Sequence, residues 1–79
     1  MSIEYKKNQA TFREVVSVDE AENLLEWLQN KPGARIDFQH CTHLHPANLQ
    51  VLMAAKIRII AWPDDADLTA WLKPALKSV

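Results

Sequence analysis

The side chains best suited to chemistry lie in one short segment, His40-Cys41-Thr42-His43-Leu44-His45. It holds all three histidines of the chain and its only cysteine. Imidazole and thiolate groups bind transition metals, and zinc or nickel suit this mixture. A cysteine near a histidine can also act as a nucleophile, provided that its thiol pKa is low and a third group orients the pair.

A metal-binding or metal-sensing site would use Cys41, His43 and His45. These residues alternate, so they would project to one side of an extended segment while His40 faces away. Structural zinc sites usually pair ligands from two separate segments, and no further Cys or His exists here. Any remaining ligand would therefore be Asp, Glu, water or another subunit. A packing and capping role for the segment is favoured, with no cofactor, and metal binding is the alternative.

Catalysis by Cys41 is disfavoured, because neighbouring side chains at a strand end usually point apart. The single glycine, Gly33, also argues against a Gly-rich loop around phosphate or a nucleotide. We therefore expect a protein that is not an enzyme.

Composition narrows the class further. Seventy-nine residues are enough for one domain, residues 1–79. The net charge of −1, with scattered basic residues, argues against a nucleic-acid partner. No run approaches the roughly 20 apolar residues of a membrane span. The first residues do not resemble a signal peptide, and one cysteine excludes an internal disulfide, so we expect a cytoplasmic protein.

Periodicity and end signals predict the secondary structure. Ser17 and Glu20 have the spacing of a capping box before a helix that Pro32-Gly33 ends. Pro46 suits the first turn of a second helix. Pro63 and the acidic run after it open a third helix, in which Pro74 should cause a kink or a restart. Strands are expected at Ile3–Tyr5, Ala10–Phe12, Ala34–Gln39 and Lys56–Trp62.

The expected inward side chains follow from the same patterns. They are Leu24, Leu25 and Leu28; Ile36 and Phe38; Leu49, Leu52 and Met53; Ile57, Ile59 and Ala61; and Leu68, Trp71, Leu72 and Ala75.

The element order β-β-α-β-α-β-α predicts a small α/β domain. We expect a mixed sheet of about four strands with three helices packed on one face. Polar residues alternate through the inner strands, so the other face should be open to water or to a partner. A chain this short buries only about 60% of its unfolded surface, and a homodimer would add to its stability.

Two segments carry a family resemblance. Arg35-Ile36-Asp37-Phe38-Gln39, a short loop, and His45-Pro46-Ala47-Asn48-Leu49-Gln50-Val51-Leu52 resemble a compact STAS domain. This family contains bacterial anti-sigma factor antagonists and the cytoplasmic tails of sulphate transporters. Asp37 matches the Asp of the family's strand, and Leu49 matches the Leu of its Asp-Ser/Thr-Ser/Ala-Gly-Leu turn. The resemblance covers roughly Val15 to Trp62.

The turn itself departs from the family. Its Asp, its phosphorylatable Ser/Thr and its Gly correspond to His45, Pro46-Ala47 and Asn48, so no hydroxyl remains there. We do not expect the family's phosphorylation switch. The resemblance still implies a non-catalytic module of bacterial signalling or regulation, which binds another protein through Thr42, His43, His45 and Asn48. The free N–H groups at the start of the following helix would suit an acidic group or a phosphate.

Overall fold

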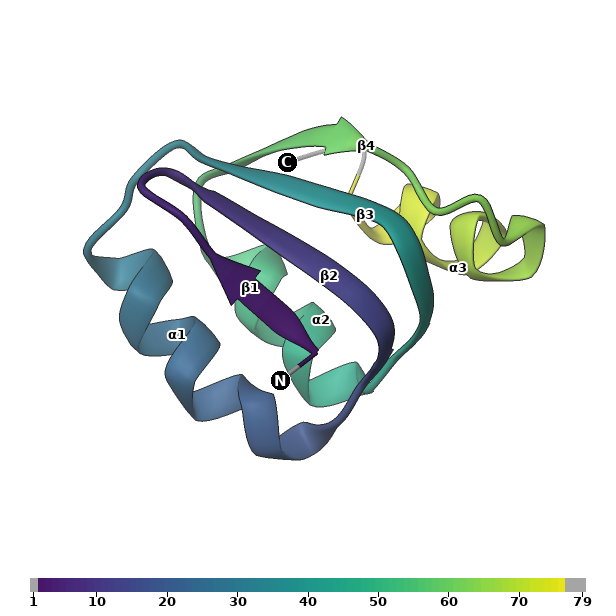
Figure 1. The fold of residues 1–79 in the computed structure, drawn as a ribbon, viewed down its shortest axis with the longest axis horizontal. Helices are drawn as coiled ribbons and strands as arrows, with labels where there is room; N and C mark the ends of the chain where they lie inside the picture. Colours follow the sequence, from purple (N-terminus) through teal and green to yellow (C-terminus); the bar gives the residue numbers. More distant parts are fainter. Residues whose placement is uncertain (1, 77–79) are drawn as a thin grey trace.

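The computed structural model describes residues 2–76 (Figure 1). Its elements follow the expected order. They are β1 (Ile3–Tyr5), β2 (Gln9–Val16), the 3-10 turn η1 (Val18–Glu20), α1 (Ala21–Gln29), β3 (Ala34–Leu44), α2 (Pro46–Ala54), β4 (Ile57–Ala61) and α3 (Ala66–Leu76).

The four strands form one mixed sheet in the order β1-β2-β3-β4. The β1–β2 pair is antiparallel, whereas β2–β3 and β3–β4 are parallel. The helices cover one face of this sheet, with α1 and α2 side by side and α3 against α2 and β3 (Figure 1). The predicted fold class is therefore confirmed.

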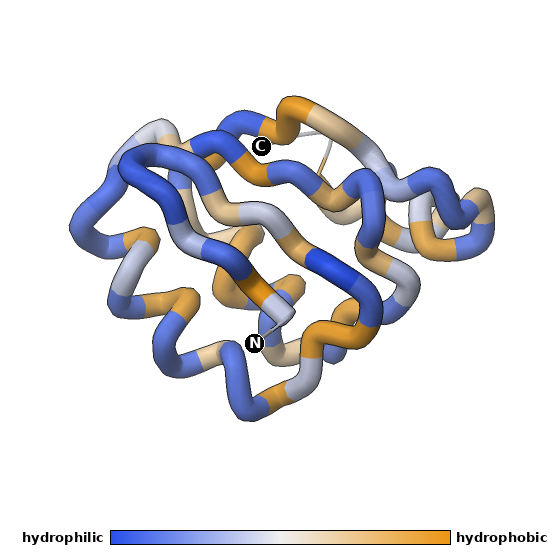
Figure 2. Tube along the Cα trace, viewed as in Figure 1, coloured by the Kyte–Doolittle hydropathy of each residue, from blue (hydrophilic) through white to orange (hydrophobic). Residues whose placement is uncertain are grey.

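The core lies between the sheet and the helices. Phe12 of β2 and Phe38 of β3 pack at its centre, with ring centroids 4.9 Å apart. Along the first half of β3, hydrophilic and hydrophobic positions alternate, as expected for a strand with only one face against the core (Figure 2). The helices contribute the buried leucines Leu24, Leu28, Leu49, Leu52, Leu68, Leu72 and Leu76.

The main departure from expectation is the length of β3. The expected strand ended at Gln39, but β3 continues to Leu44, so His40 to Leu44 is strand and not loop. β3 contains one residue more than β2 between Asp37 and His40, and another between Cys41 and His43. These are β-bulges, and each one shifts the inward-facing positions by a residue. After Phe38 the buried residues of β3 are consequently Cys41 and Leu44.

Two expected end signals are wrong in detail. Ser17 makes no side-chain capping bond, and a 3-10 turn precedes α1. The carboxylate of Glu20 instead accepts a hydrogen bond from the backbone N–H of Ser2, at 3.3 Å. α3 continues past Pro74 to Leu76, so of the two outcomes expected at Pro74, a kink or a restart, the restart is wrong and the kink stays a prediction.

Four expected inward positions also change. Leu25, Met53 and Trp71 are exposed, and Asn48 is buried in place of Met53. In β4, an extra residue opposite the Ile36–Asp37 step leaves Trp62, rather than Ala61, packed against the core.

Candidate functional site

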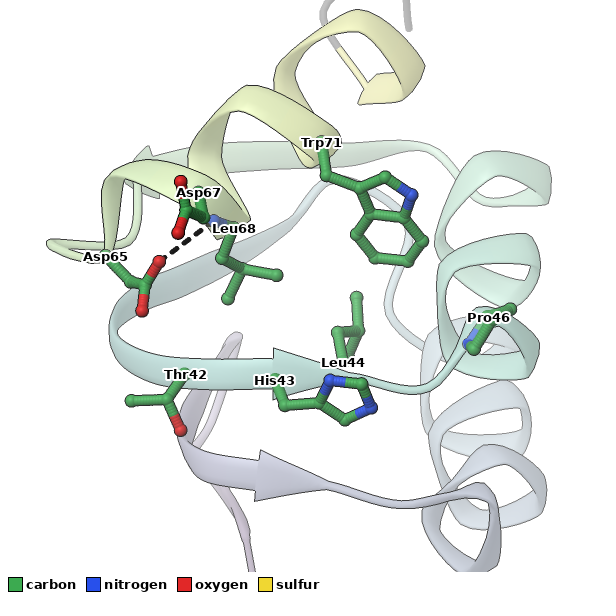
Figure 3. Close-up of a pocket in the computed structure, with 8 residues that line it drawn as sticks. All are labelled: Thr42, His43, Leu44, Pro46, Asp65, Asp67, Leu68 and Trp71. Atoms are coloured by element: carbon green, nitrogen blue, oxygen red, sulfur yellow. Dashed lines mark hydrogen bonds between the residues drawn. The ribbon is translucent and has the colours of Figure 1, made fainter.

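A hollow of about 400 Å³ lies where β3 ends (Figure 3). It is lined by Thr42, His43 and Leu44 of β3, by Pro46 at the start of α2, by Asp65 just before α3, and by Asp67, Leu68 and Trp71 of α3. In open sheets with parallel strands, ligands bind outside the carboxyl ends of the strands. The hollow occupies this position for β3.

The base of the hollow is apolar. Leu44 and Leu68 are buried there, and the indole of Trp71 lies above Leu44 (Figure 3). Trp71 is 43% exposed. Solvent-accessible tryptophans of this kind are enriched at binding surfaces, because one large rigid ring supplies much contact area.

The second bulge of β3 places Thr42 and His43 at the surface. His43 is the register partner of Val15 on β2, and Val15 is 53% exposed. The preceding residue, Glu14, has a φ of 53°. A non-glycine residue in this left-handed region costs roughly 1–2 kcal/mol, and such strain is concentrated at functional sites. Val15, Thr42, His43, Asp67 and Trp71 together are called the strand-end surface below.

The start of α2 has no free backbone donor. The side chain of His45 accepts a hydrogen bond at Nδ1 from the N–H of Ala47, at 3.0 Å. The carbonyl oxygen of His45 accepts from the N–H groups of Asn48 and Leu49, at 2.9 and 3.3 Å. Pro46 has no N–H. The N–H donors expected to bind an acidic group or a phosphate are therefore occupied by His45 in this structure.

Asn48 holds α2 against the end of β2. Its Nδ2 donates to the carbonyl oxygen of Ser17 at 2.7 Å and more weakly to that of Val16 at 3.5 Å. The side chain is fully buried, so it acts inside the fold. Of the four residues expected at a partner surface, Thr42 and His43 are exposed, His45 is half-buried as a helix cap, and Asn48 is not accessible.

Cys41 faces the core and is only 1% exposed. Its Sγ donates to the backbone carbonyl oxygen of His43, at 3.4 Å. Burial raises the pKa of the thiol to about 11, although this hydrogen bond acts in the opposite direction. The thiol is therefore protonated at neutral pH, and a thiol is a much weaker nucleophile than a thiolate.

The bulge also separates the expected metal ligands. Cys41 points into the core while His43 is exposed, so the expected common orientation of Cys41, His43 and His45 is wrong. Within residues 2–76, no three His, Cys, Asp or Glu side chains are grouped so that they could hold a metal ion. Zinc or nickel binding stays a prediction, and its test is given in the Discussion.

The α3 side of the hollow is acidic. Asp65 caps the helix, since its Oδ1 accepts from the N–H of Leu68 at 3.0 Å. Asp67 is exposed and has no hydrogen-bond partner within the described part of the chain. No lysine or arginine is among the described residues that line the hollow. From the sequence, this acidic run predicts only the start of a helix, and no role at a site is predicted for it.

Comparison with protein-family models, curated proteins and solved structures finds no match to this chain. Among the described helices, none has both the length and the apolar character needed to cross a membrane.

Proposed function

We propose that this chain is a non-catalytic, STAS-like protein-interaction module of bacterial signalling or regulation, acting in the cytoplasm. It binds a partner protein through the strand-end surface. The observation that carries this proposal is the hollow beside Thr42 and His43, with the exposed Trp71 on its opposite wall. Val15 extends the same surface across β2.

The charge of the hollow favours a basic group from the partner. Asp65 and Asp67 line one side, and the start of α2 has no N–H left for an anion. An arginine or lysine of the partner could pair with Asp67 while its charged head also lies over the ring of Trp71. Cations are attracted to indole faces by about 0.5–2 kcal/mol, which adds to the charge pairing. This differs from the acidic group that the helix start alone suggests.

Site-specific photo-cross-linking in the native cell tests the proposal. A photoreactive benzoylphenylalanine replaces Thr42 in one variant and Met53 in the other. Met53 is 48% exposed on α2 and does not line the hollow. We expect a defined protein adduct at position 42 and none at position 53.

The identity of the contact is checked by combining the position-42 cross-linker with further changes. His43→Ser and Asp67→Asn should each remove most of the adduct, whereas Met53→Ser should leave it unchanged. His43 and Asp67 are exposed, so the free energy of unfolding of each variant should stay within about 0.5 kcal/mol of that of the unchanged protein. Equal adducts at positions 42 and 53, or adducts that survive both changes, would refute the proposed surface.

A further inference from the structure

A second surface is formed by the outer sides of α1 and α2, and its lining residues do not include those of the strand-end surface. Two hollows of about 350 and 410 Å³ lie along the line where these helices meet. Both are lined by Leu25, Val51 and Ala54, so they form one continuous furrow, called the α1/α2 groove below. The two helices lie side by side under the sheet in Figure 1.

Most of the side chains that line the groove are apolar. Leu25 is 41% exposed in its middle, and small side chains at Ala21, Ala47 and Ala54 leave room for close approach. α2 carries no charged residue at all. The sheet covers the side of α2 that bears Leu49 and Leu52, and α1 and α3 also lie against this helix. Its exposed residues Gln50 and Ala54 line the groove and carry no charge.

The two ends of the α1/α2 groove carry opposite charges. Glu22 lines one end and Lys56 the other, and no other charged side chain among the described residues lines the groove. Neither forms an ion pair within residues 2–76, where the one ion pair joins Arg13 to Glu4.

This pattern is self-complementary. Consider a second copy related by a two-fold axis that lies in the plane of the interface and runs across the groove, perpendicular to its length, near Leu25. That symmetry places Glu22 beside Lys56 of the other copy, twice, and brings the two Leu25 side chains together at the centre. An axis along the groove would instead place like charges together. Two-fold dimers use the same patch on both copies, so one patch must match itself in this way.

We propose that two copies of this chain form an antiparallel homodimer through the α1/α2 groove. Leu25, Val51 and Ala54 form its apolar centre, and Glu22 and Lys56 set the relative orientation of the two copies. The strand-end surface is not part of the groove, so each copy in the dimer keeps its own partner site.

Sedimentation equilibrium over a wide dilution series tests the dimer with the full chain. The unchanged protein should dimerise reversibly. Leu25→Asp should weaken the dimer about 100-fold or more, since it buries two charges at the centre. Met53→Asp, at a similarly exposed apolar residue of α2 outside the groove, should change it by less than about 3-fold.

A charge exchange tests the orientation. Glu22→Lys and Lys56→Glu should each weaken the dimer about 10-fold, because two attractive pairs become repulsive. The double variant E22K/K56E should return to within about 3-fold of the unchanged protein. A protein that stays monomeric, a double variant as weak as the single ones, or equal losses for L25D and M53D would overturn the proposal. Circular dichroism of each variant confirms that it is folded.

Discussion

Val15 of β2 and His43 of β3 lie side by side in parallel register, even though β3 has gained two residues relative to β2 since the strands began to pair at Gln9 and Arg35. The two bulges that supply these residues turn His43 outward and Cys41 inward. These two backbone irregularities therefore decide both features of the site. They present an imidazole at the surface and remove the thiol from it.

The left-handed residue beside this pair gives the first prediction. Glu14 has a φ of 53°, where glycine has no steric penalty and alanine does. Glu14→Gly should therefore be more stable than Glu14→Ala by about 0.5–1 kcal/mol in urea unfolding. Glu26 in the middle of α1 is the matched control, because alanine there should be more stable than glycine by about 1 kcal/mol. The same order of the two variants at both positions would contradict the strained bulge.

The order of elements could be predicted because it depends on local signals. Leucine spacing, alternation in β3 and β4, and Pro46 at a helix start all act within a few residues. The site could not be predicted in the same way. A bulge depends on how two strands pair, and neither Thr42 nor Glu14 has a residue type that marks one.

The prediction that Trp71 faces the core is also wrong. The buried stripe of α3 is Leu68, Leu72 and Leu76, with a spacing of four. The expected inward residues Leu68, Trp71, Leu72 and Ala75 follow a mixed spacing of three and four, which includes Trp71 and omits Leu76. Once α3 is seen to continue to Leu76, Trp71 falls beside the stripe and is available to the hollow. The regular spacing of four residues from Leu68 to Leu76, continued through Pro74, was the signal that could have predicted an exposed Trp71.

A second prediction concerns Asn48, whose buried side chain donates to the carbonyl oxygens of Ser17 and Val16. Asn48→Asp keeps the size but replaces the donating Nδ2 group by a carboxylate oxygen that faces both carbonyl oxygens, so the free energy of unfolding at neutral pH should fall by about 3 kcal/mol or more. Asn30→Asp is the control, since Asn30 makes an exposed bond to the carbonyl oxygen of Glu26. Asn30 is the C-cap of α1 and is exposed, so the effect of this change should be about 1 kcal/mol or less. Similar losses at both positions would show that Asn48 does not tie α2 to β2.

A third prediction follows from the thiol of Cys41. Its pKa is raised by burial from 9.0 to about 11, so the folded state favours the protonated form. The resulting stability is fully present below pH 9 and is lost as the pH rises toward 11, by about 2 kcal/mol in total. The pKa of Tyr5 is also raised, to about 12, by burial and then by Glu20, and it adds to the loss at still higher pH.

Comparison with Cys41→Ala isolates the thiol, because Tyr5 is common to both proteins. The stability advantage of the unchanged protein over this variant should shrink between pH 9 and pH 11. At neutral pH, iodoacetamide should react with the folded protein much more slowly than with the urea-unfolded protein. Rapid alkylation of the folded protein would instead support Cys41 as a nucleophile.

The fourth prediction tests zinc or nickel binding at Cys41, His43 and His45. A ligand that binds only the native state raises its stability by RT ln(1 + [L]/Kd), so a specific site gives a higher melting temperature. Because Cys41 faces the core and His43 the surface, we expect no rise with either metal up to about 100 µM. Tryptophan fluorescence follows the melting, since Trp71 lies beside His43 in the hollow. A rise that Cys41→Ala and His43→Ala each abolish would show that the end of β3 rearranges to bind metal, and the metal-sensing function would then replace the proposed one.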